Sequence, residues 1–181
     1  MKTTNKITLL SLAGGLTLVG TAFAAWQFNA NVAEAQNSNV EITKVTNTGS
    51  IADVATFYLT LDQKGAYWTN KSFVDSDDEI TDADVVESFE FTYTGSANSN
   101  DVSDVTLSVS YEVDSAISEY VTVSGGELGE ATVLNNVKSA TYTLPSLAYT
   151  ANKPTTLANY NAMKDALEGK TITFSLVATV A

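Results

Sequence analysis

Val105-Thr106-Leu107-Ser108-Val109-Ser110-Tyr111-Glu112-Val113 is the stretch that decides the fold of this 181-residue chain. Apolar and polar residues alternate along it without a break, which is the pattern of a β-strand that buries one face. We therefore expect a strand here, with its odd-numbered side chains turned toward a hydrophobic core.

The same period of two recurs along most of the chain, and turn-forming residues such as Gly125-Gly126 separate the segments. Seven or eight short strands with this spacing predict an all-β, jelly-roll-like β-sandwich. The chain has no internal repeat and no linker rich in glycine and proline, so we expect one domain over residues 37–181. The other expected strands are residues 40–45, the run with Ala55, Phe57, Leu59 and Leu61, the run with Phe89, Phe91 and Tyr93, and residues 119–123, 139–144 and 171–180.

One segment departs from this period, because apolar residues recur in it at helical spacing. Pro154 precedes the segment and Gly169 follows it, as is typical of helix ends. We expect one short helix across an end or edge of the sandwich, with its apolar face in the core. The residues at helical spacing are Leu157, Tyr160, Met163 or Lys164, and Leu167, and we expect Leu157, Tyr160 and Leu167 to be buried.

Residues 1–24 have the composition of an export signal. Lys2 and Lys6 form a short basic region, an apolar run follows over residues 7–19, and Ala22-Phe23-Ala24 supplies small residues. A signal peptidase accepts short side chains beside the bond that it cuts, so we expect cleavage after Ala24. The alternative is an uncleaved anchor, but the run is shorter than the roughly 20 residues that span a bilayer. The sequence thus predicts an extracellular or cell-surface protein that is outside the membrane once processed.

The composition excludes several classes of function. The chain has 9 lysines, no arginine and 21 acids, and loss of Lys2 and Lys6 with the signal changes the net charge from −12 to −14. Nucleic acid is excluded as a partner, because phosphate backbones need clusters of basic residues. The acidity serves solubility or a cationic partner, and the sequence leaves both open.

Catalytic chemistry is limited by the same composition. The chain has no histidine and no cysteine, which excludes histidine-ligated zinc, serine triads and cysteine nucleophiles. Pairs of carboxylates remain, and glycosidases need only two. Because acids are spread over the whole chain, two carboxylates would lie near each other by chance, and such a pair does not indicate a glycosidase. We therefore expect no enzyme.

A further alternating segment directly follows the expected cleavage site. Trp26, Phe28, Ala30 and Val32 alternate with polar residues, and the next strand signal begins only at Val40. Two large aromatic side chains left in water would each forgo about 2 kcal/mol of burial. We therefore expect a free N-terminal strand over residues 25–36 that is buried against a sheet.

Two sheets can receive this strand. It can fold back as an edge strand of its own domain, or it can cross into a neighbouring copy and complete the sheet of that copy by strand addition. The second contact is head-to-tail and does not close on itself, so it propagates into a filament. We expect the second arrangement, and the first stays open.

The cleavage region and the strand after it resemble the TasA/camelysin family. The resemblance rests on Gly20-Thr21-Ala22-Phe23-Ala24-Ala25-Trp26-Gln27-Phe28 and on the closing segment Ile172-Thr173-Phe174-Ser175-Leu176-Val177-Ala178-Thr179. It implies a jelly-roll domain, biofilm-matrix or pilus-like fibres in bacteria, related bundling pili in archaea, and donor-strand exchange through the amino terminus. By position, the donor-strand role falls on Trp26, Phe28, Ala30 and Val32.

An acidic cluster is the candidate metal site. Six acids lie within residues 75–84, and calcium binds several hard oxygen ligands from one flexible loop. A solvated acidic loop is the other interpretation. Calcium is therefore the one cofactor that stays open, with the ligands Asp75, Asp77, Asp78 and Glu79.

Two further features concern surface ligands. Asn70-Lys71-Ser72 has the form of a glycosylation site. Tyr67 and Trp68 are candidates for a sugar-binding or inter-subunit patch, and core packing is the expected alternative.

The sequence as a whole predicts a secreted, non-enzymatic subunit that assembles with copies of itself into extracellular filaments for biofilm matrix, adhesion or bundling. Signal peptidase is its expected partner during export. The alternative is a monomeric cell-surface binding module for a glycan or for calcium, which keeps its first strand in its own sheet.

Overall fold

The computed structural model of the chain describes residues 36–62, 64–71, 80–96 and 102–180. The expected signal peptide, Trp26, Phe28, Ala30 and Val32 of the N-terminal strand, and the acids Asp75, Asp77, Asp78 and Glu79 lie outside these residues.

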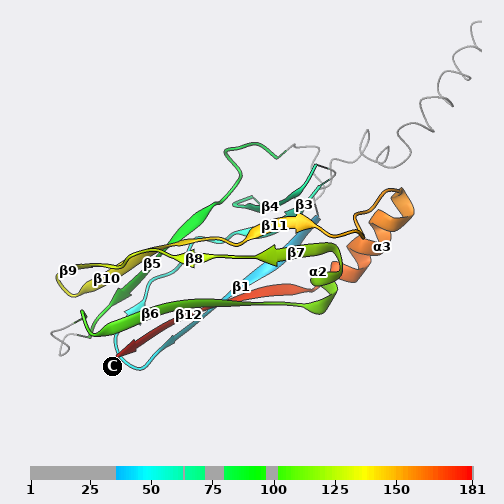
Figure 1. Cartoon of the computed structure of the whole chain (residues 1–181). Helices are drawn as coiled ribbons and strands as arrows, with labels where there is room; N and C mark the ends of the chain where they lie inside the picture. Colours follow the sequence, from blue (N-terminus) through cyan, green and yellow to red (C-terminus); the bar gives the residue numbers. More distant parts are fainter. Residues whose placement is uncertain (1–35, 63, 72–79, 97–101, 181) are drawn as a thin grey trace, which may run out of the picture.

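The described part consists of twelve strands and two helices (Figure 1). The helices are α2 (Ser115–Tyr120) and α3 (Leu157–Leu167). The strands are β1 (Gln36–Thr46), β2 (Ser50–Ile51), β3 (Tyr58–Leu61), β4 (Ala66–Thr69), β5 (Ser88–Thr94), β6 (Val105–Val113), β7 (Val121–Ser124), β8 (Glu127–Leu128), β9 (Thr132–Leu134), β10 (Val137–Thr143), β11 (Ser146–Tyr149) and β12 (Thr171–Val180).

The strands form two facing layers. The first layer is a five-stranded sheet in the order β4-β3-β1-β12-β6. The second has the order β2-β5-β10-β8, with β9 also paired to β10, and β11 and β7 form a separate two-stranded sheet. This architecture confirms the predicted all-β sandwich, whereas the jelly-roll connectivity stays a prediction.

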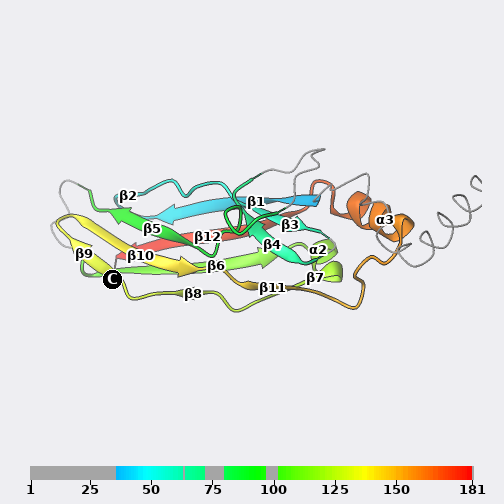
Figure 2. The same cartoon turned by 90° about the horizontal axis from the view of Figure 1, so that it is seen from above.

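The two ends of the molecule differ (Figure 2). One end, which we call the helix end, carries α2 and α3, and there β6 ends and β12 begins. The other end, which we call the hairpin end, carries the tip of the β9–β10 hairpin, the start of β6 and the end of β12. Since β1 runs parallel to β12, β1 also begins at the helix end.

The core fills the space between the layers and is centred on Phe174 of β12, which is fully buried. Five other aromatic rings lie with their centroids 5.6–6.3 Å from the ring of Phe174. Such edge and tilted contacts add to the free energy gained by burying each ring. The five rings belong to Phe57, Trp68, Phe89, Tyr111 and Tyr142.

Most predicted strands are confirmed, including the deciding stretch, which is β6. The prediction of a strand over residues 119–123 is wrong at its start, because α2 continues to Tyr120. The carboxylate of Asp114 accepts a hydrogen bond from the backbone N–H of Ala116 at 2.9 Å, which caps the first turn of α2. The prediction of a single helix is also wrong, because α2 is a second helix.

The predicted helix is confirmed as α3, with one error in its buried face. Tyr160, Met163 and Leu167 are buried, whereas Leu157 is 49% exposed. Leu157 is the first residue of α3, directly after the N-cap Thr156. The core-facing row begins one turn later, and Met163 contributes to it.

Candidate functional site

Among the described strands, β6 is the last of its sheet, so one of its edges pairs with β12 and the other pairs with none of them. The backbone N–H of Asp114 donates to the carbonyl oxygen of Thr171 at 3.3 Å, just beyond the end of the ladder. In an antiparallel ladder, the N–H and C=O of one residue point to the same side, and alternate residues point to opposite sides. The even-numbered residues of β6 therefore bond to β12, and the odd-numbered ones direct their N–H and C=O outward.

The outward groups at the hairpin end of β6 are satisfied. The N–H of Val105 donates to Val102 O at 3.3 Å, and its carbonyl oxygen accepts from the Lys138 ammonium at 2.6 Å. Within the described ranges, no hydrogen bond reaches the outward N–H or C=O of the next four odd-numbered residues. These residues, which we call the open edge, are Leu107, Val109, Tyr111 and Val113.

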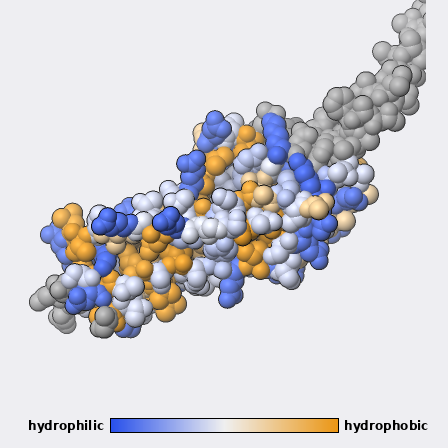
Figure 3. Space-filling view, in the orientation of Figure 1, coloured by the Kyte–Doolittle hydropathy of each residue, from blue (hydrophilic) through white to orange (hydrophobic). Residues whose placement is uncertain are grey.

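The side chains of the same row are apolar and become less covered toward the helix end. Leu107 is 9% exposed, whereas Val109, Tyr111 and Val113 are half-buried. Leu128 and Ala131 of the facing layer are also only partly buried. Figure 3 shows hydrophobic side chains at the surface where β6 and β10 run. An added strand would cover this apolar row.

Natural sheets protect long edges with lysine, proline, bulges or a covering segment. β6 is nine residues long and contains no lysine, proline or glycine. The opposite edge of the same sheet, β4, is partly covered: Val86 N–H donates to Trp68 O at 2.8 Å, and Asn70 N–H donates to Asp84 O at 2.9 Å. Among the described strands, β6 thus offers the longest unprotected edge.

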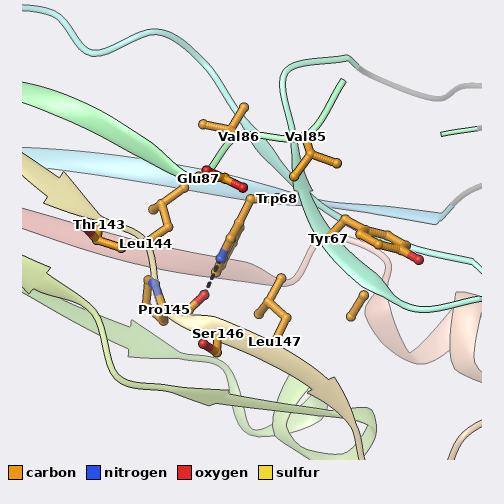
Figure 4. Close-up of a pocket in the computed structure, with 11 residues that line it drawn as sticks. Tyr67, Trp68, Val85, Val86, Glu87, Thr143, Leu144, Pro145, Ser146 and Leu147 are labelled. Carbon is orange, nitrogen blue, oxygen red and sulfur yellow. Dashed lines mark hydrogen bonds between the residues drawn. The ribbon is translucent and has the colours of Figure 1, made fainter. Parts of the chain in front are cut away.

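A first hollow of about 340 Å³ lies beside Trp68, between β4, residues 85–87 and residues 143–147 (Figure 4). The indole of Trp68 points into it, 5% exposed, and its N–H donates to the carbonyl oxygen of Pro145 at 2.7 Å. Core packing of Trp68 is therefore confirmed. A buried ring with its N–H already bonded gives no stacking face for a sugar.

A second hollow of about 290 Å³ lies between residues 53–57 and the start of β5. Val86 lines both hollows, and Phe57 and Phe89 contribute apolar surface to the second. Glu87 contributes a carboxylate to the first hollow. Glu90 and Asp53 contribute carboxylates to the second. Neither hollow brings together the convergent polar groups that catalysis needs.

The described acids form no metal centre. Within the described residues, no three acidic side chains lie close enough to hold an ion. The carboxylate of Asp84 accepts hydrogen bonds from the N–H and hydroxyl of Thr81 at 2.9 and 2.7 Å, which lower the pKa of Asp84 below its usual value. Asn70, the first residue of the predicted glycosylation triplet, is exposed.

Sequence reasoning identified the residues of β6 but not their role. Alternation tells which side chains face the core, and it says nothing about which edge of a strand stays unpaired. The absence of lysine and proline from residues 105–113 is typical of a strand that is paired on both sides, so no local signal indicates that this edge is open.

Comparison of the chain with protein-family models, with curated proteins and with solved structures finds no match. The resemblance to the TasA/camelysin family therefore stays a prediction. None of the helices that the structure describes is long and apolar enough to cross a membrane.

Proposed function

We propose that this chain is an exported, non-enzymatic structural subunit that assembles with copies of itself into extracellular filaments. In this proposal Trp26, Phe28, Ala30 and Val32 of one copy add a strand to the sheet of the next. The open edge of β6 carries the proposal, because it combines backbone groups that bond to no described residue with a partly exposed apolar row.

The donor and the open edge match in length and pattern. Residues 25–32 span about 26 Å when extended, and the nine residues of β6 span about 30 Å. Backbone bonds to the odd-numbered residues of β6 would supply affinity, and the alternate apolar side chains of the donor would fill the space beside Val109 and Tyr111.

The distribution of charge also favours a contact between the donor segment and the open edge. Copies with a net charge of −14 repel one another over most of their surface. Residues 25–33 contain no charged side chain, and neither do residues 105–111. The proposed contact therefore joins two uncharged segments of a strongly acidic protein.

The wider role follows from the predicted export and from the TasA/camelysin resemblance. Signal peptidase would release Ala25 as the first residue, leaving the processed subunit outside the membrane. Its filaments would serve the biofilm matrix, adhesion or bundling between cells.

The test uses the chain produced without residues 1–24. Replacing Trp26 and Phe28 by serine removes the apolar face of the donor, and replacing Gln27 and Asn29 by serine is the matched control. We expect the control to sediment as filaments and the first variant to remain as folded monomers. Equal filament yield from both variants would refute the proposed donor.

The alternative that the sequence leaves open is a monomeric surface-binding module, although the buried Trp68 beside the first hollow offers no stacking face for a sugar. Such a module would take a glycan or, at Asp75, Asp77, Asp78 and Glu79, calcium. Calorimetric titration of the monomer with calcium and with surface polysaccharides distinguishes the two functions. Binding by a protein that forms no filaments would support the module.

A further inference from the structure

We infer, on the basis of the proposed function, that the N-terminal strand of one copy binds antiparallel along β6 of a second copy, from its hairpin end. The same strand cannot cover the open edge of its own chain. The inference rests on the register of three strands and on the length of chain before Gln36.

The register places β1 and β6 at known levels along the sheet. Val40 pairs with Ile172, and Ile172 pairs with Val113, so these three residues lie level with one another. Gln36 comes four residues before Val40 in the same strand. It therefore lies about 13 Å beyond the end of β6, toward the helix end.

The chain before Gln36 is too short to return to β6. A strand placed outside β6 of its own chain lies three strand spacings from β1, or about 14 Å. The four residues from Val32 to Gln36 span at most about 14 Å. Crossing three strand spacings would use the whole length of residues 32–36. Val32 could therefore advance no farther along the strand direction than Gln36.

Within one chain, this geometry would leave half of the open edge without a partner strand. Trp26 lies six residues before Val32, or about 20 Å farther along, which brings it level with Tyr111 at most. Leu107 and Val109 would keep their unpaired groups. The strand would also run parallel to β6, which is the slightly less stable pairing.

A second copy removes both restrictions. Its chain leaves β1 at its helix end. In the proposed head-to-tail contact, this end faces the hairpin end of the neighbour. From there residues 32 to 26 run from Val105 toward Val113, which makes the donor antiparallel to β6. All four residues of the open edge can then be paired.

This arrangement fixes the polarity of the filament. Each copy donates at its helix end and accepts from its hairpin end, so the two contacting surfaces differ and the assembly stays open. Every copy except the one at the accepting end has its β6 covered.

Disulfide trapping tests the orientation, because the chain contains no cysteine. The outward side chains of the donor, at Asn29 and Asn31, would face the exposed side chain of Ser108. Such pairs, which exchange no backbone bonds, have Cα atoms about 4.5 Å apart, within reach of a disulfide. We expect N31C/S108C or N29C/S108C filaments, once oxidised, to give a ladder of covalent oligomers on a denaturing non-reducing gel.

The matched control is Q27C/S108C. Antiparallel pairing shifts position 27 along the strand from Ser108 by four residues where Asn31 is opposite Ser108, and by two residues, or about 7 Å, where Asn29 is opposite it, and either offset is too long for a disulfide. A ladder from this control in place of the other two variants would overturn the orientation, and a disulfide confined to monomers would overturn the second copy as acceptor. Filaments without a disulfide in any variant would overturn β6 as the acceptor and leave the proposed function standing. A parent chain that forms no filaments would overturn both.

Discussion

Val109 lies directly opposite Leu176 in the ladder between β6 and β12, and its own N–H points away from β12. Replacing Val109 by proline therefore removes an outward donor and keeps the ladder to β12. Ser108, its neighbour, directs its N–H toward Val177. Ser108→Pro breaks the ladder.

From this relationship we expect V109P to fold and to lose filament formation. We expect S108P to lower the free energy of unfolding by roughly 2 kcal/mol, because the ladder bond to Val177 is lost. Circular dichroism during thermal unfolding and sedimentation of the assembled fraction measure the two effects. Filaments from V109P at the parent yield would contradict the role of the open edge.

Phe174 is expected to be the most sensitive core position, because five aromatic rings surround it. Phe174→Ala should lower the free energy of unfolding by about 3–5 kcal/mol through lost burial and the resulting cavity. Thr179→Ala, at an exposed position of the same strand, is the control and should cost less than about 1 kcal/mol. Urea unfolding followed by tryptophan fluorescence gives both values, and similar losses would refute the packing described here.

Two glycines in the left-handed region separate backbone strain from steric overlap. Gly49 has φ 67° and Gly125 has φ 79°. A Cβ at Gly49 would overlap the carbonyl oxygen of Thr94 and lie 2.6 Å from the hydroxyl oxygen of Tyr93, whereas a Cβ at Gly125 would meet nothing within 4 Å. Gly125→Ala should cost about 1 kcal/mol from strain alone, and Gly49→Ala should cost clearly more. Melting temperatures of the two variants decide the order.

Tyr149 makes stability depend on alkaline pH. Its hydroxyl donates to Asp62 O at 2.8 Å, and burial, followed by the nearby Asp62 carboxylate, raises the pKa of Tyr149 well above its usual value. An unfolded tyrosine ionises near pH 10. The stabilisation is therefore complete below about pH 10 and is lost as the pH rises toward the folded pKa.

Tyr149→Phe removes this linkage. We expect it to cost about 1 kcal/mol at pH 8, because the bond to Asp62 is lost. Between pH 9 and 11 its stability should fall less steeply than that of the parent. Urea unfolding across this range measures both slopes, and equal slopes would rule out a partly buried Tyr149 that stays neutral in the folded protein.

The sequence predicts the strands of this fold well where one face is fully buried. Ile172, Phe174, Leu176 and Ala178 alternate with less buried residues because β12, which pairs with β1 and β6, turns one face to the core. The six residues of α2 are too few to establish a helical period, and their start depends on a local cap by Asp114.

The candidate site is less predictable for a different physical reason. Pairing of Val113 with Ile172 joins residues 59 positions apart, and β1 joins β12 across more than 130 positions. No local pattern encodes which strand becomes last in a sheet. The donor segment is visible in the sequence, whereas the edge that would accept it requires the fold.

Negative-stain electron microscopy tests the central claim most directly. It compares the chain from Ala25 onward with the chain that also lacks residues 25–35, which keeps β1 whole, and circular dichroism verifies that each is folded. The account predicts filaments from the first chain and folded monomers from the second. Monomers from the first chain, together with an unfolded second chain, would show that the strand belongs to its own domain and would contradict the account.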